Sequence, residues 1–279
     1  MTNLQNKIDR ALRLLDAAAK TAKKESNQPL EICYSGGKDS DVILELAKMA
    51  GVNHRTIYKN TTIDPPGTIK HCVEVGAEIV RPKESFRELL ARRGWPSRRV
   101  RFCCSTLKEY KILDYAVVGV RRDESWKRAK MYHEPEICRV YSAKSKARQY
   151  LPILDWTLTD VAEFIEKRSI KCASTYYDEH GNFHPERRLG CLCCPLMYRK
   201  NRIKAFEMYP NMVKMYLKQG EIYRKTHKKF LNDVYEWFVC YLFTESIAEF
   251  EERFGNNLFS ARADCKNFLE NYFKIELNL

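Results

Sequence analysis

Four cysteines fall into two short motifs that are typical of metal binding. Cys103 and Cys104 are adjacent, and Cys191 and Cys194 follow much later in the spacing Cys-x-x-Cys. Four thiolates from two distant loops can close a tetrahedral site. An adjacent pair is poor geometry for one zinc ion, whereas each cysteine of a [4Fe–4S] cluster binds its own iron. The spacing therefore favours a [4Fe–4S] cluster over zinc, and buried free cysteines are the alternative.

A fifth cysteine, Cys193, lies inside the second motif without a required ligand role. Arg187 and Arg188 precede it, and a thiol beside cations and an iron centre has a lowered pKa. Cys193 is therefore a candidate sulfur carrier, and the competing interpretation is an unreactive neighbour or an alternate ligand. The chain contains eleven cysteines, an odd number that cannot all form disulfides. In a reducing compartment, clustered cysteines indicate metal or redox chemistry.

A glycine-rich turn near the N-terminus has the chemistry of a phosphate-binding loop. The sequence SGGKDS combines hydroxyls and a lysine with two glycines that let backbone N–H groups approach an anion. It is not a Walker A loop, which would need glycine at Ile32 and a hydroxyl at Asp39. The alternative is a tight strand-to-helix turn with Asp39 or Ser40 as N-cap. The candidate phosphate-binding residues are Ser35, Gly36, Gly37, Lys38, Asp39 and Ser40.

A second anion-binding segment has the sequence RRDESWKR. Arg121, Arg122 and Arg128 are bidentate anion binders, and they follow an apolar run that is typical of a short strand. Ligands of open parallel sheets bind at the carboxyl ends of the strands. We therefore expect these arginines at the ligand edge of a sheet, rather than in a surface ion-pair patch with Asp123 and Glu124.

Strand and helix patterns alternate in the first part of the chain. LEICY, HRTIYKN, AEIVRP and YAVVGVR are predicted strands, whereas SDVILELAKMA, ESFRELLARRG, STLKEYKILDYA and TLTDVAEFIEK are predicted helices. This alternation predicts an α/β fold with a parallel sheet and helices on both faces. The segment beyond Tyr198 has an almost wholly helical pattern. We expect an amphipathic helix in residues 1–28, a nucleotide-binding domain in residues 29–198 and a helical subdomain in residues 199–279.

The composition indicates a folded protein with a polyanionic partner or substrate. Of the 279 residues, 44% are hydrophobic, and the formal net charge is +13. Basic residues are dense in residues 91–101 and 198–204, for which a solvated basic face is the alternative. No apolar run approaches the roughly 18 residues of a membrane helix, and the N-terminus lacks the apolar core of a signal peptide. A cytoplasmic protein is expected.

Taken together, the motifs resemble a known protein family. SGGKDS resembles the pyrophosphate loop (PP-loop) of the adenine nucleotide α-hydrolase superfamily, which includes N-type ATP pyrophosphatases, tRNA sulfurtransferases and phosphoadenosine phosphosulfate (PAPS) reductases. The cysteine pattern resembles that of iron–sulfur assimilatory sulfate reductases, and residues 60–66, 119–128 and 150–165 are similar to further PAPS reductase segments. The resemblance implies a Rossmann-like fold and a [4Fe–4S] cluster on the four cysteines. It also implies an adenine nucleotide bound by the PP-loop together with Thr62, Asp64, Arg121, Arg122, Glu124 and Arg128.

The chain departs from the assimilatory reductases in two ways. Their nucleophilic cysteine lies in a C-terminal Glu-Cys-Gly-Leu/Ile-His motif, which this sequence lacks, and Cys265 is better interpreted as a core cysteine. The PP-loop contains a lysine, which is typical of ATP-cleaving members and would neutralise a departing pyrophosphate. A PAPS-reductase-like chain with an iron–sulfur cluster and an ATP-type loop resembles the DNA phosphorothioation sulfurtransferases. That similarity implies ATP with Mg²⁺ as substrate, cleavage between the α- and β-phosphates, and Lys38, Asp39 and Cys193 as catalytic residues.

Three functions are consistent with these patterns. The favoured one is sulfur transfer, with a nucleic acid as candidate acceptor and a cysteine desulfurase or thioredoxin-like protein as sulfur or electron donor. The first alternative is reduction of adenylyl sulfate or PAPS to sulfite. The second is a non-catalytic nucleic-acid-binding component with a structural cluster, whose binding would weaken steeply with salt and would not depend on Lys38 or ATP.

Overall fold

The computed structural model describes the chain apart from residues 1–2, 111–112, 143–144, 228–231, 256–260 and 279. The chain divides into two compact units. Unit 1 consists of Met1–Pro82 and Leu107–Gly190, and unit 2 consists of Lys83–Thr106 and Cys191–Leu279. Unit 1 contains the β-sheet, whereas the regular elements described in unit 2 are helices.

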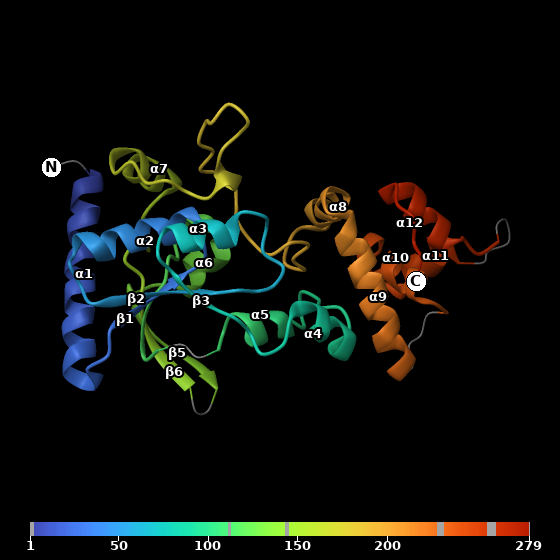
Figure 1. The fold of residues 1–279 in the computed structure, drawn as a ribbon, viewed down its shortest axis with the longest axis horizontal. Coiled ribbons are helices and arrows are strands. Elements are labelled where there is room, and N and C mark those ends of the chain that lie inside the picture. Colours follow the sequence, from blue (N-terminus) through green and yellow to red (C-terminus); the bar gives the residue numbers. More distant parts are fainter. Residues whose placement is uncertain (1–2, 111–112, 143–144, 228–231, 256–260, 279) are drawn as a thin grey trace. The chain divides into compact units, whose positions relative to one another are not determined.

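Unit 1 is organised around a six-stranded sheet with the order β3-β2-β1-β4-β6-β5 (Figure 1). Strand β1 pairs in parallel with β2 and β4, and β3 and β6 extend the parallel sheet on either side. Strand β5 pairs with β6 in the antiparallel direction. The loops that follow β1 and β4 therefore leave the same edge of the sheet. The strands are β1 (Leu30–Tyr34), β2 (His54–Lys59), β3 (Glu78–Val80), β4 (Tyr115–Val117), β5 (Glu136–Ser142) and β6 (Ser145–Tyr150).

Helices cover this sheet and share one apolar core with it, which confirms the predicted α/β class. The N-terminal helix α1 buries Leu4, Ile8, Ala11 and Leu15 at helical spacing. These side chains join a core to which β1, α2 and α7 also contribute. The helical elements of unit 1 are α1 (Asn3–Ser26), α2 (Lys38–Met49), α3 (Thr68–Glu74), η1 (Arg122–Glu124), α6 (Trp126–Met131), α7 (Leu158–Lys167) and η2 (Ser174–Tyr176).

The start of α7 is fixed by a capping box. The Thr157 side chain accepts from the Asp160 backbone, and the Asp160 side chain accepts from the Thr157 backbone. Lys7 of α1 also donates to Asp160, at 2.5 Å. Burial opposes ionisation of Asp160, but these hydrogen bonds outweigh it and hold the pKa of the carboxyl below its usual value. Asp160 therefore ties α1 to α7.

Unit 2 is a helical assembly around an aromatic core. The ring of Trp95 stacks on that of Trp237 with centroids 3.8 Å apart, and its indole N–H donates to the Tyr216 carbonyl. A Cβ on Gly220 would lie 2.5 Å from the Trp95 ring, so this position requires glycine. The helices are α4 (Phe86–Arg93), α5 (Phe102–Leu107, whose last residue falls in unit 1), α8 (Arg199–Met208), α9 (Pro210–Thr226), α10 (Val234–Phe243), α11 (Ile247–Phe254) and α12 (Cys265–Phe273).

The structure differs from the sequence-based organisation in three places. Residues 83–106, expected in the nucleotide-binding domain, group with the C-terminal helices because α4 packs on α9. The helix expected over residues 105–116 ends at Leu107, and β4 begins at Tyr115. The hairpin of β5 and β6 was not predicted. In the part of the chain that the structure describes, no helix has the length and apolarity to cross a membrane.

Candidate functional site

The glycine-rich turn connects the end of β1 to the start of α2. Gly36 has a left-handed backbone (φ +75°), and a Cβ there would also approach the Thr68 side chain to 3.0 Å. Gly37 is the N-cap of α2, not Asp39 or Ser40 as the alternative interpretation would have it. The Ser40 hydroxyl instead donates to the Gly37 carbonyl at 2.6 Å. This hydrogen bond closes the turn, and α2 begins immediately after it, so that the amino end of the helix faces the turn.

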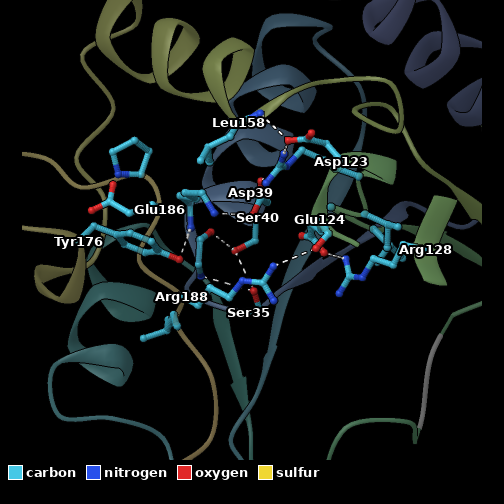
Figure 2. Close-up of a pocket in the computed structure, with 18 of the residues that line it drawn as sticks. Ser35, Asp39, Ser40, Asp123, Glu124, Arg128, Leu158, Tyr176, Glu186 and Arg188 are labelled. Carbon is cyan, nitrogen blue, oxygen red and sulfur yellow. Dashed lines mark hydrogen bonds and ion pairs between the residues drawn. The ribbon is translucent and has the colours of Figure 1, made fainter. Parts of the chain in front are cut away.

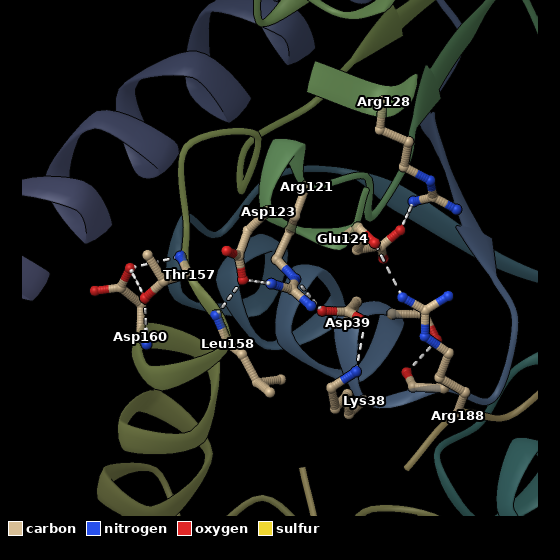
Figure 3. Close-up of polar contacts among 12 residues, drawn as sticks. Lys38, Asp39, Arg121, Asp123, Glu124, Arg128, Thr157, Leu158, Asp160 and Arg188 are labelled. Atoms are coloured by element: carbon tan, nitrogen blue, oxygen red, sulfur yellow. Dashed lines mark hydrogen bonds and ion pairs between the residues drawn. The ribbon is translucent and has the colours of Figure 1, made fainter. Parts of the chain in front are cut away.

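Two buried cations converge on the carboxylate of Asp39 (Figure 3). Lys38 Nζ lies 3.0 Å from Asp39 Oδ2, and Arg121 Nε lies 2.7 Å from Asp39 Oδ1. Lys38 and Arg121 are 4% and 3% exposed. Charges buried to this degree are found in proteins when they are paired or bind a ligand. The loop after β4 thus supplies a cation to the loop after β1.

The close approach of these two loops depends on Gly119. A Cβ at this position would lie 2.9 Å from the Asp39 carbonyl oxygen. Any side chain would therefore push the segment after β4 away from the PP-loop.

Acidic side chains pair with the arginines of the segment that follows β4. Asp123 accepts from Arg121 at 3.0 Å and from the Leu158 backbone N–H at 2.9 Å. Glu124 forms an ion pair with Arg128. Burial raises the pKa of the Glu124 carboxyl above its ordinary value, and the charge of Arg128 opposes that effect. The segment after β4 is thereby fixed to the start of α7 and to α6.

These groups line a cavity of about 440 Å³ (Figure 2). Its volume lies within the range of small-molecule and cofactor sites. The wall comes from the PP-loop, the segment after β4, the start of α7 and the loop before residue 190. The predicted residues on the cavity wall are Ser35, Gly37, Lys38, Asp39, Ser40, Arg121, Glu124 and Arg128.

Other predicted nucleotide-binding residues lie elsewhere. Arg122 turns toward Asp155 and the carbonyls that follow α6, and it is not among the residues that line the cavity. Gly36 lies within the turn but is not among the residues that line the cavity. Thr62 is exposed with φ +62°. Asp64 accepts from Thr61 on the wall of an adjoining cavity of about 250 Å³, which shares Cys33, Ser35 and Val118 with the first.

Sequence reasoning missed one cavity residue that contacts the loop directly. The Tyr176 hydroxyl accepts from the Lys38 backbone N–H at 3.3 Å, and the Lys38 ammonium lies 5.6 Å from the centre of the Tyr176 ring. Burial raises the pKa of this phenol to about 12, so it stays protonated. No local pattern distinguishes Tyr176 from Tyr177. Arg188 and Glu186 also line the cavity and were not assigned to it.

The four predicted metal-binding cysteines all lie in unit 2 and act on one another. The pKa of Cys103 is raised by a hydrogen bond with the Cys104 thiol, then by burial, and then by the charges of Cys104, Cys194 and Cys191. Thiols that oppose one another's ionisation in this way need a cation before they can all be thiolates. The role of these four residues as ligands of one cluster stays a prediction.

An adjacent pair of cysteines suits an iron–sulfur cluster better than a single ion. Among the described residues, no three thiol, imidazole or carboxylate groups are arranged to hold one metal ion. A zinc ion needs its sulfurs at about 2.3 Å from one point, whereas a cubane offers each cysteine a separate iron. Cys103, Cys104, Cys191 and Cys194 are the residues that would hold such a cluster.

Cys193 does not have the environment expected of a sulfur carrier. It is fully buried, and burial raises the pKa of its thiol to about 12. The cation that partly offsets this effect is Arg202 of α8, rather than Arg187 or Arg188. The expected lowering of its pKa is therefore wrong, because desolvation outweighs the nearby charge. Cys265 is likewise buried, in α12, as expected of a core cysteine.

Comparisons with known proteins agree with the motifs. Residues 29–197 match the phosphoadenosine phosphosulfate reductase domain. Two uncharacterized proteins of Methanocaldococcus jannaschii are similar to the chain. MJ0973 is 29% identical over 203 residues, covering 68% of this chain and 47% of its own length. MJ0066 is 27% identical over 228 residues, covering 73% and 45%. The chain thus spans about half the length of these curated relatives.

Two solved structures are similar to parts of this chain. A PAPS reductase from Candida auris in complex with phosphate is 17% identical, with a TM-score of 0.39 and coverage of 62% of this chain and 91% of that chain. The U34-tRNA thiolase NcsA of Methanococcus maripaludis with its [4Fe–4S] cluster is also 17% identical, with a TM-score of 0.39 and coverage of 79% and 78%. The domain match covers more than half of the sequence, and on that basis the chain belongs to the PAPS reductase domain family.

Proposed function

We propose that this chain is a sulfurtransferase that binds ATP with Mg²⁺ in the 440 Å³ cavity and cleaves it between the α- and β-phosphates. The observation that carries the proposal is the pair of buried cations, Lys38 and Arg121, at the amino end of α2. A triphosphate brings several negative charges, which these cations and the amino end of α2 would neutralise.

Each charged group has a defined task in this proposal. Lys38 releases Asp39 and moves onto the departing pyrophosphate, whose developing charge it stabilises. Asp39, freed from Lys38, becomes a ligand for the Mg²⁺ that screens the phosphates. Arg121 keeps Asp39 oriented, and Tyr176 fixes the Lys38 backbone from the other side.

The reaction exchanges one oxygen of the acceptor for sulfur. A carbonyl or phosphoryl oxygen of the acceptor attacks the α-phosphorus, the Pα–O–Pβ bond breaks, and pyrophosphate leaves. A hydrosulfide equivalent from an external sulfur donor then bonds to the activated atom of the acceptor. The bond from that atom to oxygen breaks, AMP leaves with the oxygen, and the hydrosulfide proton goes to solvent. The exchange involves no net oxidation or reduction.

The four cysteines of unit 2 would hold the [4Fe–4S] cluster of this enzyme. A bound cluster would supply iron to which a sulfur atom can be attached. Around it, the chain provides a largely buried environment. Cys103 and Cys193 are buried, and Cys104, Cys191 and Cys194 are half-buried. We assign Cys193 to shaping this environment, because its side chain is fully buried.

Product analysis tests this function. The cluster-loaded full chain is incubated anaerobically with α-labelled ATP, Mg²⁺, hydrosulfide and an oligonucleotide. We expect AMP and pyrophosphate in equal amounts, and Lys38→Ala should lower their formation by about 100-fold or more. Lys48→Ala is the matched control, since Lys48 is an exposed lysine at the other end of α2. Formation of ADP and phosphate instead would refute the proposal.

The family match favours a second candidate, reduction of adenylyl sulfate or PAPS to sulfite with electrons from a dithiol protein. That reaction needs a thiolate nucleophile. Burial raises the pKa of both Cys193 and Cys265 to about 12, which makes each a poor one. Sulfite formation that is lost in Cys193→Ser or Cys265→Ser would favour reduction over transfer.

A further inference from the structure

A large aromatic side chain is exposed to solvent on α6, the helix that also contributes Arg128 to the cavity wall. Trp126, the first residue of α6, is 77% exposed. The other tryptophans are buried or half-buried: Trp95 and Trp156 are below 9% exposed, and Trp237 is partly covered by its stacking on Trp95. An exposed ring of this size contributes nothing to the core. The ring is accessible to a ligand.

The helix that carries this ring is basic. Its six residues, WKRAKM, include three cations and no acid. Lys127 and Lys130 are exposed, and the Lys130 ammonium lies 5.2 Å from the centre of the Trp126 ring. An aromatic ring flanked by cations is the arrangement with which proteins bind single-stranded nucleic acids, by stacking a base on the ring and pairing the cations with phosphates.

The same helix reaches the nucleotide cavity. Arg128, two residues after Trp126, lines the cavity and pairs with Glu124 on its wall (Figure 2). Ser125 caps α6 by accepting from the Arg128 backbone N–H at 3.3 Å, which fixes the helix relative to the segment after β4. Trp126 and a residue of the cavity wall are therefore carried by the same short helix.

We propose that Trp126, Lys127 and Lys130 form the landing surface for a single-stranded nucleic acid whose modified atom enters the 440 Å³ cavity beside Arg128. This inference rests on the proposed function, and it names the acceptor class and the surface that recognises it. One base stacks on Trp126, and the two lysines bind the flanking phosphates. The neighbouring nucleotide then reaches the ATP bound in the cavity. Single-stranded DNA and single-stranded RNA share this chemistry.

The test measures binding of fluorescein-labelled (dT)20, (U)20 and a 20-base-pair duplex to the full chain by anisotropy. Trp126→Ala should weaken binding of a single strand by between about fivefold and about 150-fold, the range for loss of one stacked base. Trp126→Phe should retain most of the affinity because phenylalanine still stacks. Met131→Ala is the matched control: it removes an exposed apolar side chain from the same helix, but one without a ring, and it should leave the affinity unchanged.

Salt dependence separates the two kinds of contact. Trp126→Ala should leave the slope of log affinity against log salt unchanged, because stacking releases no ions. The double variant Lys127→Ala/Lys130→Ala should reduce that slope by about 1.4, since each phosphate contact to a single strand contributes about 0.7. The tighter of the two single strands identifies the acceptor. Equal binding of Trp126→Ala and the parent, or duplex binding that matches the single strands, would overturn the inference.

A second readout distinguishes this inference from the proposed function. Trp126 is not on the cavity wall, so Trp126→Ala should bind ATP as the parent does. If the parent binds single strands through Trp126 but yields no AMP and pyrophosphate, the proposed function fails and the landing surface stands. If AMP and pyrophosphate form but Trp126→Ala binds nucleic acid normally, the landing surface is wrong.

Discussion

The neighbouring arginines Arg121 and Arg122 should respond very differently to the same substitution. The Arg121 side chain is 4% exposed and pairs with Asp39, which is 16% exposed. Removing one partner of a buried ion pair costs about 3–5 kcal/mol. Lys38 still neutralises Asp39 at 3.0 Å, which places Arg121→Ala at the lower end, about 3 kcal/mol. The Arg122 side chain is 34% exposed and its partner Asp155 is 58% exposed, so Arg122→Ala should cost about 1 kcal/mol or less.

Two assays compare Arg121→Ala with Arg122→Ala. In thermal unfolding, Arg121→Ala should lower the midpoint by roughly 6–12 °C and Arg122→Ala by roughly 4 °C or less. In ATP titrations, loss of a charged hydrogen bond to phosphate should make Arg121→Ala bind about 10- to 100-fold more weakly, whereas Arg122→Ala should bind normally. Equal losses of stability and of ATP affinity in the two variants would refute the assignment of Arg121, and not Arg122, to the cavity.

Three further predictions concern the loops, the cap of α7 and the cysteines. Gly119→Ala should cost about 1–3 kcal/mol of stability and weaken ATP binding, because its Cβ would meet the PP-loop at 2.9 Å, whereas Gly190→Ala, with open space around it, should do neither. Asp160→Asn should destabilise the protein by about 1 kcal/mol at pH 7 in urea unfolding. Because the pKa of Asp160 is lowered in the folded protein, this difference should vanish as the pH falls below about 4, and a difference that grows in acid would contradict the assignment. Anaerobic iron analysis should find that Cys104→Ser loses cluster iron and that Cys240→Ser, a half-buried cysteine outside the motifs, retains it.

The elements whose chemistry is local could be predicted from the sequence. The run LEICY, the turn SGGKDS and the apolar face of the next helix specify β1, the PP-loop and α2 within some twenty residues. The cap at Thr157 is equally local. The hairpin of β5 and β6 was missed because its strands carry charged residues such as Arg139 and Arg148, which obscure the alternation that marks a strand.

The parts of the site that depend on distant contacts could not be predicted. The opposite directions of Arg121 and Arg122 are set by the backbone as it leaves β4 and enters η1, which residue type does not specify. Tyr176 reaches the PP-loop across 138 residues of sequence. The burial that raises the pKa of Cys193 comes from the packing of unit 2, whereas the sequence showed only the basic residues near it. Residue types thus indicated the candidate chemistry, and packing determined which of these residues line the cavity.

The most direct test of the central claim is anaerobic calorimetry of the cluster-loaded protein, with ATP–Mg²⁺ and adenylyl sulfate titrated in parallel into the parent and into Lys38→Ala. Tighter binding of ATP than of adenylyl sulfate, lost in Lys38→Ala, is the predicted result, because Lys38 and Arg121 are placed to neutralise a triphosphate. Tighter binding of adenylyl sulfate, unaffected by Lys38→Ala, would contradict the account and assign the cavity to a sulfonucleotide reductase.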